Sequence, residues 1–191
     1  LFYLFLIFFI LIKKPKAKIS WVVSLFLFCL GFWSFSHAFL YNTALTEETA
    51  SLWYKINSFG WIAFSPFFIW FIVLFTKFRK FYKSKLFLIL IFLPAVLLIY
   101  KQWQGDLFAG FVLHSYGWTY VWDHTVWTYM YYAYYSVLLI LALFILIKFM
   151  KETKQNEREK QARILIYTTI ISVLIGSALN VVLPQLGIYS I

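Results

Sequence analysis

The chain has 191 residues, of which 63% are hydrophobic and 13% charged, and its formal net charge is +10. A soluble domain of this length has no core that could hold so much apolar surface, so the composition excludes a soluble protein and predicts the lipid bilayer as solvent. The positive charge does not indicate a nucleic-acid partner, because the basic residues form short clusters between apolar segments, as topology signals do. Cys29 is the single cysteine, which excludes a disulfide or a cysteine-rich metal site within one chain.

Six apolar segments predict an all-α integral membrane protein, a polytopic helical bundle that forms one transmembrane domain over residues 1–191. Most segments approach the roughly 20 residues that a spanning helix needs. Their continuous apolarity favours helices over a barrel, whose strands alternate. The predicted spans are residues 1–12, 19–40, 56–76, 86–100, 126–147 and 164–183.

The two ends of the chain predict a truncated seven-helix bundle with six visible spans. The chain begins at Leu1 without a methionine, and the short first segment is typical of the end of a helix. The last residues, LPQLGIYSI, are typical of a span end, a turn and the start of another crossing. No output domain is expected within these 191 residues.

Basic residues occur in alternate connections and predict the orientation. The first, third and fifth connections hold four, five and six Lys or Arg residues, whereas the second and fourth hold only Lys55 and Lys101. By the positive-inside rule the three basic connections are cytoplasmic. The start of the chain and the connections at residues 41–55 and 101–125 are then outside.

The spans hold no deeply placed Asp, Glu, Lys or Arg, which argues against ion-coupled carriers, pumps and voltage sensors. Prolines inside spans predict kinks, since neighbouring groups must bond the carbonyls that proline frees. We expect helix irregularity at Gly60, Pro66, Asn180 and Pro184. Ordinary packing and capping would explain the same four residues equally well.

The connection before the fifth span differs from the others, because it is neither apolar nor basic. Residues 111–121, FVLHSYGWTYV, place β-branched and aromatic residues on both sides of Gly117, which predicts a short β-hairpin over the helix ends. His114, Asp123 and His124 match no metal-ligand spacing, so we expect no metal and no cofactor. Asp123 and His124 are expected to cap or begin the fifth helix.

Aromatic residues mark the outer end of the fifth span, where spacings of three and four put several on one helical face. One interpretation is an aromatic belt at the lipid headgroups. The other is an outward-opening pocket for a small apolar or cationic ligand. The candidate ligand-binding residues are Trp118, Trp122, Asp123, His124, Thr128, Tyr131, Tyr132 and Tyr135.

No stretch predicts catalysis, since the sequence has no Gly-rich phosphate loop, no paired carboxylates and no nucleophile elbow. We therefore predict no catalytic residue in this chain. The basic residues 148–163, which lack Gly and Pro, predict that the fifth and sixth helices continue as a solvated helical hairpin near anionic lipid heads.

Three stretches of the chain place Gly, Pro, Trp and Asn residues at fixed spacings in apolar sequence. They are Leu30–Tyr41 (LGFWSFSHAFLY); Trp53–Thr76, with Trp53, Gly60 and Pro66; and Lys160–Gly187, with basic residues before an apolar helix that ends near Asn180 and Pro184. These stretches resemble the seven-transmembrane N-terminal sensor region of bacterial membrane histidine kinases. In that order they are similar to the outer end of its second helix, to its third helix and to its sixth.

The resemblance implies the input module of a two-component signalling protein in the bacterial cytoplasmic membrane. Its implied partners are an unknown small-molecule or membrane signal, a cytoplasmic output domain beyond the C-terminus and a second copy in a homodimer, with no nucleic acid. Two alternatives remain open. One is a fragment of a multi-pass transporter, and the other is a membrane-embedded enzyme that would use His37, His114, Asp123 and His124.

Overall fold

The structure is a computed structural model that describes residues 1–178. It divides into two compact units, one formed by residues 1–142 and one that begins at Leu143. Four segments of the described chain are long and apolar enough to cross a membrane, by length and composition: Lys18–Leu40, Glu47–Thr76, Lys85–Gln104 and Val126–Glu152. A shorter apolar helix, Phe2–Lys13, precedes them.

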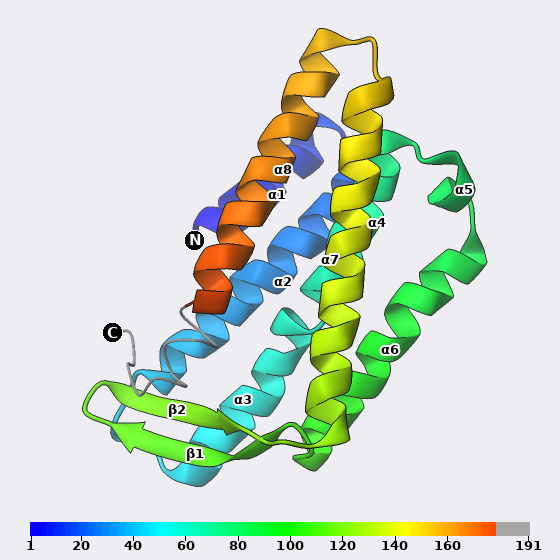
Figure 1. Cartoon of the computed structure of the whole chain (residues 1–191). Helices are drawn as coiled ribbons and strands as arrows, with labels where there is room; N and C mark the ends of the chain where they lie inside the picture. The colour runs from blue at the N-terminus through cyan, green and yellow to red at the C-terminus, as the bar shows by residue number, and fades with distance from the viewer. Residues whose placement is uncertain (179–191) are drawn as a thin grey trace. The chain divides into compact units, whose positions relative to one another are not determined.

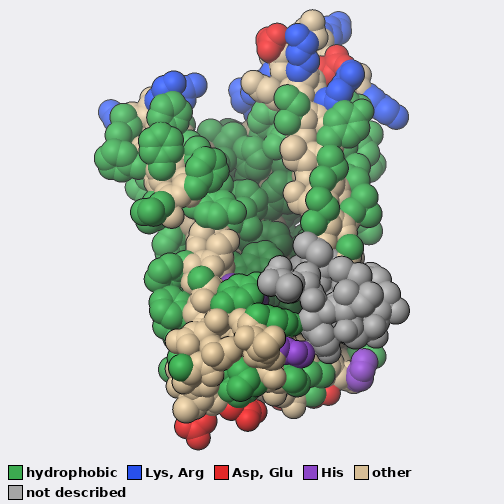
Figure 2. Space-filling view, turned by 90° about the vertical axis from the view of Figure 1, so that its left-hand side faces the viewer, with side chains coloured by type: hydrophobic (Ala, Val, Ile, Leu, Met, Phe, Trp, Pro, Cys, Tyr) green, Lys and Arg blue, Asp and Glu red, His purple; other side chains and the backbone are tan. Residues whose placement is uncertain are grey.

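The first unit is a group of helices with a hairpin at one end (Figure 1). Its elements are α1 (Phe2–Lys13), α2 (Lys18–Leu40), α3 (Glu47–Trp61), α4 (Phe64–Thr76), the single turn α5 (Arg79–Tyr82), α6 (Lys85–Gln104), β1 (Phe108–His114), β2 (Gly117–Trp122) and the first part of α7 (Val126–Glu152). Figure 2 shows hydrophobic side chains over much of the flank of these helices.

The third predicted span corresponds to two helices, α3 and α4, separated by Ile62 and Ala63. Helix α3 begins at Glu47, well before the predicted start of the span at residue 56. The Thr46 hydroxyl caps it by accepting a bond from the Thr49 N–H at 3.3 Å, and acidic residues occupy the first turn. These polar first turns carry no hydropathy signal, so the sequence pattern reveals only the apolar remainder of the helix.

Helices α2 and α3 run past each other with their backbones in close contact at Gly60. A Cβ atom on this residue would lie 2.8 Å from both the carbonyl oxygen of Cys29 and the backbone nitrogen of Trp33. Small residues allow this kind of approach between membrane helices. The helix is interrupted at Ile62–Ala63, which lies between Gly60 and Pro66, two of the residues where we expect helix irregularity.

The predicted hairpin is confirmed. Strands β1 and β2 are antiparallel, and His114 pairs with Gly117, so Ser115 and Tyr116 form the turn. Gly117 has φ of 135°, a conformation that residues other than glycine rarely adopt. A register shift between Phe108 and Gly110 adds one residue to β1 near its start.

The second unit contains the end of α7 and helix α8 (Asn156–Ser177), joined by Thr153–Gln155. Both helices extend through the basic segment, as the sequence predicted. Exposed ion pairs lie along it, among them Arg163 with Glu159 at 2.7 Å. Asn180 and Pro184, two of the predicted irregularities, lie outside the described residues, as does the end of the sixth predicted span.

Candidate functional site

Three aromatic side chains of the first unit, from α3, β2 and α7, meet where the hairpin packs on the helices. Trp122, at the end of β2, stacks against Tyr131 of α7 with ring centroids 5.8 Å apart and planes 14° from parallel. Trp61, at the end of α3, stands perpendicular to both rings, 4.8 Å from Tyr131 and 6.0 Å from Trp122. The three rings pack directly against one another, Trp122 and Tyr131 nearly parallel and Trp61 edge-on to both, and we call this group the aromatic slot.

More rings extend the slot toward the hairpin. Phe108 lies 4.8 Å from Trp122, and Tyr120 lies 4.7 Å from Phe108 and 4.5 Å from Tyr54 of α3. Tyr120 lies in β2, outside the spanning helices, and burial raises its pKa well above the usual value, with the nearby Tyr132 adding to the shift. Tyr120 therefore stays uncharged at physiological pH.

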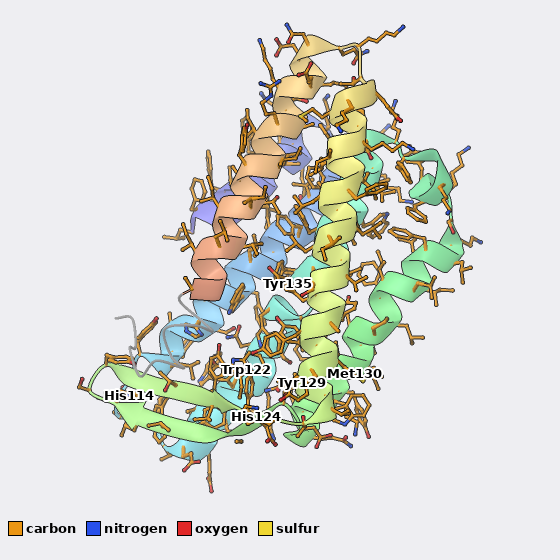
Figure 3. The ribbon with its side chains drawn as sticks, in the orientation of Figure 1. His114, Trp122, His124, Tyr129, Met130 and Tyr135 are labelled. Atoms are coloured by element: carbon orange, nitrogen blue, oxygen red, sulfur yellow. The ribbon has the colours of Figure 1, made fainter. Side chains whose placement is uncertain are left out.

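The remaining predicted residues on α7 also face this region. Tyr132 lies 5.3 Å from Trp122, and Tyr135 lies 5.8 Å from Phe64 and 6.3 Å from Tyr131. Figure 3 shows Trp122 next to the hairpin and Tyr135 farther along α7. The predicted aromatic face of the fifth helix thus packs on α3, α4 and the hairpin.

Hydrogen bonds fix the start of α7 to the segment that leads into β1. The Thr128 hydroxyl is buried and donates to the carbonyl oxygen of Leu107 at 3.2 Å, and the Thr125 hydroxyl donates to that of Asp106 at 2.7 Å. Thr125 also caps α7 by accepting a bond from the Thr128 N–H at 3.4 Å. The prediction that Asp123 and His124 cap or begin this helix was wrong, because α7 begins at Val126 and Thr125 is the residue that caps it.

Trp118 lies apart from the aromatic slot. Its indole N–H donates to the carbonyl oxygen of Leu45 at 3.0 Å, and its ring packs beside Leu40 and Tyr54. Four residues of extended strand cover roughly 13 Å, so Trp118 and Trp122 pack at different points along α3, near Tyr54 and Trp61 respectively. Trp118 attaches the hairpin to the α2–α3 connection.

The polar candidates of the outer connection are also separated. Figure 3 shows His114 at the turn end of the hairpin and His124 at the other end, before α7. His114 Nε2 lies 2.9 Å from the Thr119 hydroxyl, and His124 Nδ1 lies 3.4 Å from the Tyr129 hydroxyl. Asp123 contributes its backbone N–H to the Leu107 carbonyl oxygen at 3.1 Å. Among residues 1–178, no three His, Cys, Asp or Glu side chains gather as metal ligands would.

Several polar atoms of the first unit are buried without a hydrogen-bond partner in the described part of the chain. They include the indole nitrogens of Trp61 and Trp122, both amide atoms of Asn57 and the hydroxyl of Ser36. Asn57 and Ser36 are completely buried, and Trp61 is only 6% exposed. Buried polar groups normally have partners, so each of these is an unusual feature.

Sequence reasoning missed Asn57, Trp61, Phe108 and Tyr120. A signal was present on α3, because Tyr54, Asn57 and Trp61 follow one another at helical spacings of three and four. The predicted start of the span at residue 56 hid this face, since it placed Tyr54 in a loop.

The family model for the N-terminal 7TM region of histidine kinases matches residues 1–190. No curated protein and no solved structure matches the chain. The resemblance seen in the three sequence stretches is thus confirmed over nearly the whole length. The chain belongs to the family of N-terminal seven-transmembrane regions of histidine kinases.

Proposed function

We propose that this chain is the sensor module of a bacterial two-component histidine kinase in the cytoplasmic membrane. It receives an extracellular or intramembrane signal and passes it to a cytoplasmic output domain beyond the C-terminus. Family membership supports the sensor role, and the apolar helices support the lipid bilayer as its surroundings. A homodimer is expected from the family membership alone.

The aromatic slot is the observation that carries the proposal. It brings together side chains of α3, the hairpin and α7, so a ligand there would contact all three. A ligand shifts a conformational equilibrium only if it binds one arrangement better than another. The contact between Trp122 and Tyr131 is suited to this, because one ring is on the hairpin and the other on a helix.

Helix α7 offers a route from the slot toward the cytoplasm. It is continuous for 27 residues, from Val126 to Glu152, and at 1.5 Å per residue covers about 40 Å. Its far end lies in the basic segment that the positive-inside rule places in the cytoplasm. A change of position at Tyr131 would thus act on a helix whose sequence continues into the basic segment.

The hairpin is the proposed outer face. The first turn of α3, beside the α2–α3 connection, carries acidic Glu47 and Glu48, whereas four lysines lie within residues 13–18 at the opposite end of α2. The signal molecule would be small and apolar or cationic, held by Trp122, Tyr131, Tyr132 and Tyr135.

A kinase assay tests the proposal. The full-length kinase that contains this chain is placed in membrane vesicles, and its autophosphorylation is compared between Tyr131→Leu and Tyr129→Leu. Tyr129 is the matched control because it lies two residues away on the same helix and is 58% exposed. We expect Tyr131→Leu to change the basal or stimulated kinase rate several-fold at equal expression, and Tyr129→Leu to leave it unchanged. Equal rates for both variants and the parent would contradict a sensory role for the slot.

A further inference from the structure

We propose that the aromatic slot binds a planar, uncharged molecule with a carbonyl or amide edge, which stacks between Trp122 and Tyr131 and bonds to Trp61 and Asn57. The inference rests on the proposed sensory function and narrows its ligand class. It excludes the cationic ligand and the plain hydrocarbon, which the aromatic composition alone would also admit.

The shape of the slot requires a flat ligand. Trp122 and Tyr131 are nearly parallel with centroids 5.8 Å apart. A ring in contact with both, at about 3.5 Å from each, needs the two walls about 7 Å apart. The 5.8 Å between the centroids includes the lateral offset of two stacked rings, whose planes in contact lie only about 3.5 Å apart. Admitting one planar molecule would therefore move the hairpin roughly 3.5 Å away from α7.

Trp61 and Asn57, at one end of the slot, require a ligand with a hydrogen-bonding edge. Trp61 is perpendicular to both walls, at 90° to Tyr131 and 87° to Trp122, and its indole N–H is buried without a partner among the described residues. Asn57 lies one turn earlier on α3, roughly 6 Å away between Cβ atoms. Its amide is completely buried, and both polar atoms lack partners in the described chain. An indole donor beside an amide donor and acceptor complements a carbonyl or a cyclic amide.

The surroundings require an uncharged ligand. Among the described residues, the rings that line the slot are Trp, Tyr and Phe, and neither Trp61 nor Asn57 carries a charge. A buried cation would meet the N–H donor of Trp61 and no carboxylate, and desolvating an unpaired charge costs several kcal/mol. A neutral acceptor would instead satisfy groups that are costly to leave unpaired.

Three probes of one two-ring size separate these chemistries: 2-quinolone, which has a cyclic amide; naphthalene, which has no polar edge; and the 1-methylquinolinium cation. Binding of each to the protein in lipid nanodiscs is measured by equilibrium dialysis and corrected with empty nanodiscs. The variants are Trp61→Phe, which keeps a ring but removes the N–H, and Tyr131→Leu, which removes a wall. Trp103→Phe is the control, because Trp103 is 41% exposed and is not part of the slot.

We expect 2-quinolone to bind more tightly than the other two probes. Trp61→Phe should weaken 2-quinolone binding roughly three- to tenfold, as one hydrogen bond predicts, and leave naphthalene binding unchanged. Unchanged naphthalene binding also shows that this variant is folded. Tyr131→Leu should weaken all three probes, and Trp103→Phe none.

Two results would overturn the inference, and they differ in what else they affect. If naphthalene or the cation binds as tightly as 2-quinolone, and Tyr131→Leu weakens this binding, the hydrogen-bonding edge is wrong but the slot remains a ligand site. If no probe binding depends on Tyr131, both the inference and the slot as the proposed ligand site fail.

Discussion

The Ser65 hydroxyl donates a 3.2 Å hydrogen bond to the carbonyl oxygen of Ile62. This is the carbonyl that would accept from residue 66 in a regular helix, but Pro66 has no N–H to donate. Ser65 is buried, so without its hydroxyl this carbonyl would stay unpaired in an apolar interior. The side chain before the proline thus replaces the bond that the proline removes.

A double-mutant cycle tests this relationship. Ser65→Ala should lower the free energy of unfolding by about 1–3 kcal/mol, because it leaves a buried acceptor unpaired. In a Pro66→Ala background the restored N–H bonds Ile62, so the same change should cost much less. Denaturant titration in detergent micelles gives the four free energies of unfolding. An equal cost in both backgrounds would show that the hydroxyl does not compensate for the proline.

Gly60→Ala tests the close contact of α2 with α3. The added methyl group would meet the backbone of Cys29 and Trp33, so it must push the helices apart. We expect a loss of about 1–3 kcal/mol in the free energy of unfolding, as for other overpacked sites. Gly110→Ala is the control, because a Cβ there has nothing within 4 Å. If both variants are equally stable, the helices are not in backbone contact at this point.

Trp118→Phe tests the attachment of the hairpin to the α2–α3 connection. The change removes the bond to the Leu45 carbonyl oxygen while keeping a ring, and should cost about 1 kcal/mol. Amide hydrogen exchange in β1 and β2 should then become roughly fivefold faster, whereas exchange in α6 should not change. Trp103→Phe should leave the hairpin rates unaltered. Uniform acceleration across the first unit would instead indicate general destabilisation.

Thiol labelling tests the orientation. Gly117 is unsuitable for a cysteine, since its φ is positive and a Cβ would collide with the Leu40 carbonyl oxygen. Ser115, in the exposed turn, and Asn156, at the start of α8, are better positions. In a Cys29→Ser background, an impermeant reagent added to intact cells should label Ser115→Cys and not Asn156→Cys. The opposite pattern would invert the proposed topology.

Hydrophobic periodicity and local spacing predicted much of the fold. Continuous apolar runs predicted the long helices, and the residues around Gly117 predicted the hairpin, because both depend on short-range geometry. The start of α3 at Glu47 was missed because a helix end in a polar environment needs only a cap and favourable charges. The hydropathy pattern therefore reveals only the apolar part of such a helix.

The site was only partly predictable for a different reason. The face formed by Thr128, Tyr131 and Tyr135 follows from helical spacing, so it was found. Trp61 lies about 60 residues before its neighbours Trp122 and Tyr131 in sequence, and no local pattern relates residues so far apart. Only the tertiary path of α3 and the hairpin brings them together.

The pairing of the hairpin limits how this region can change during evolution. Trp118, Tyr120 and Trp122 alternate along β2 and all pack toward the helices, each through a different contact. If one residue were inserted into or deleted from β2, every aromatic ring after that point in the strand would turn to the opposite face of the hairpin. Natural variants should therefore gain or lose residues in pairs within the strands, and single-residue length changes should be confined to the turn at Ser115–Tyr116.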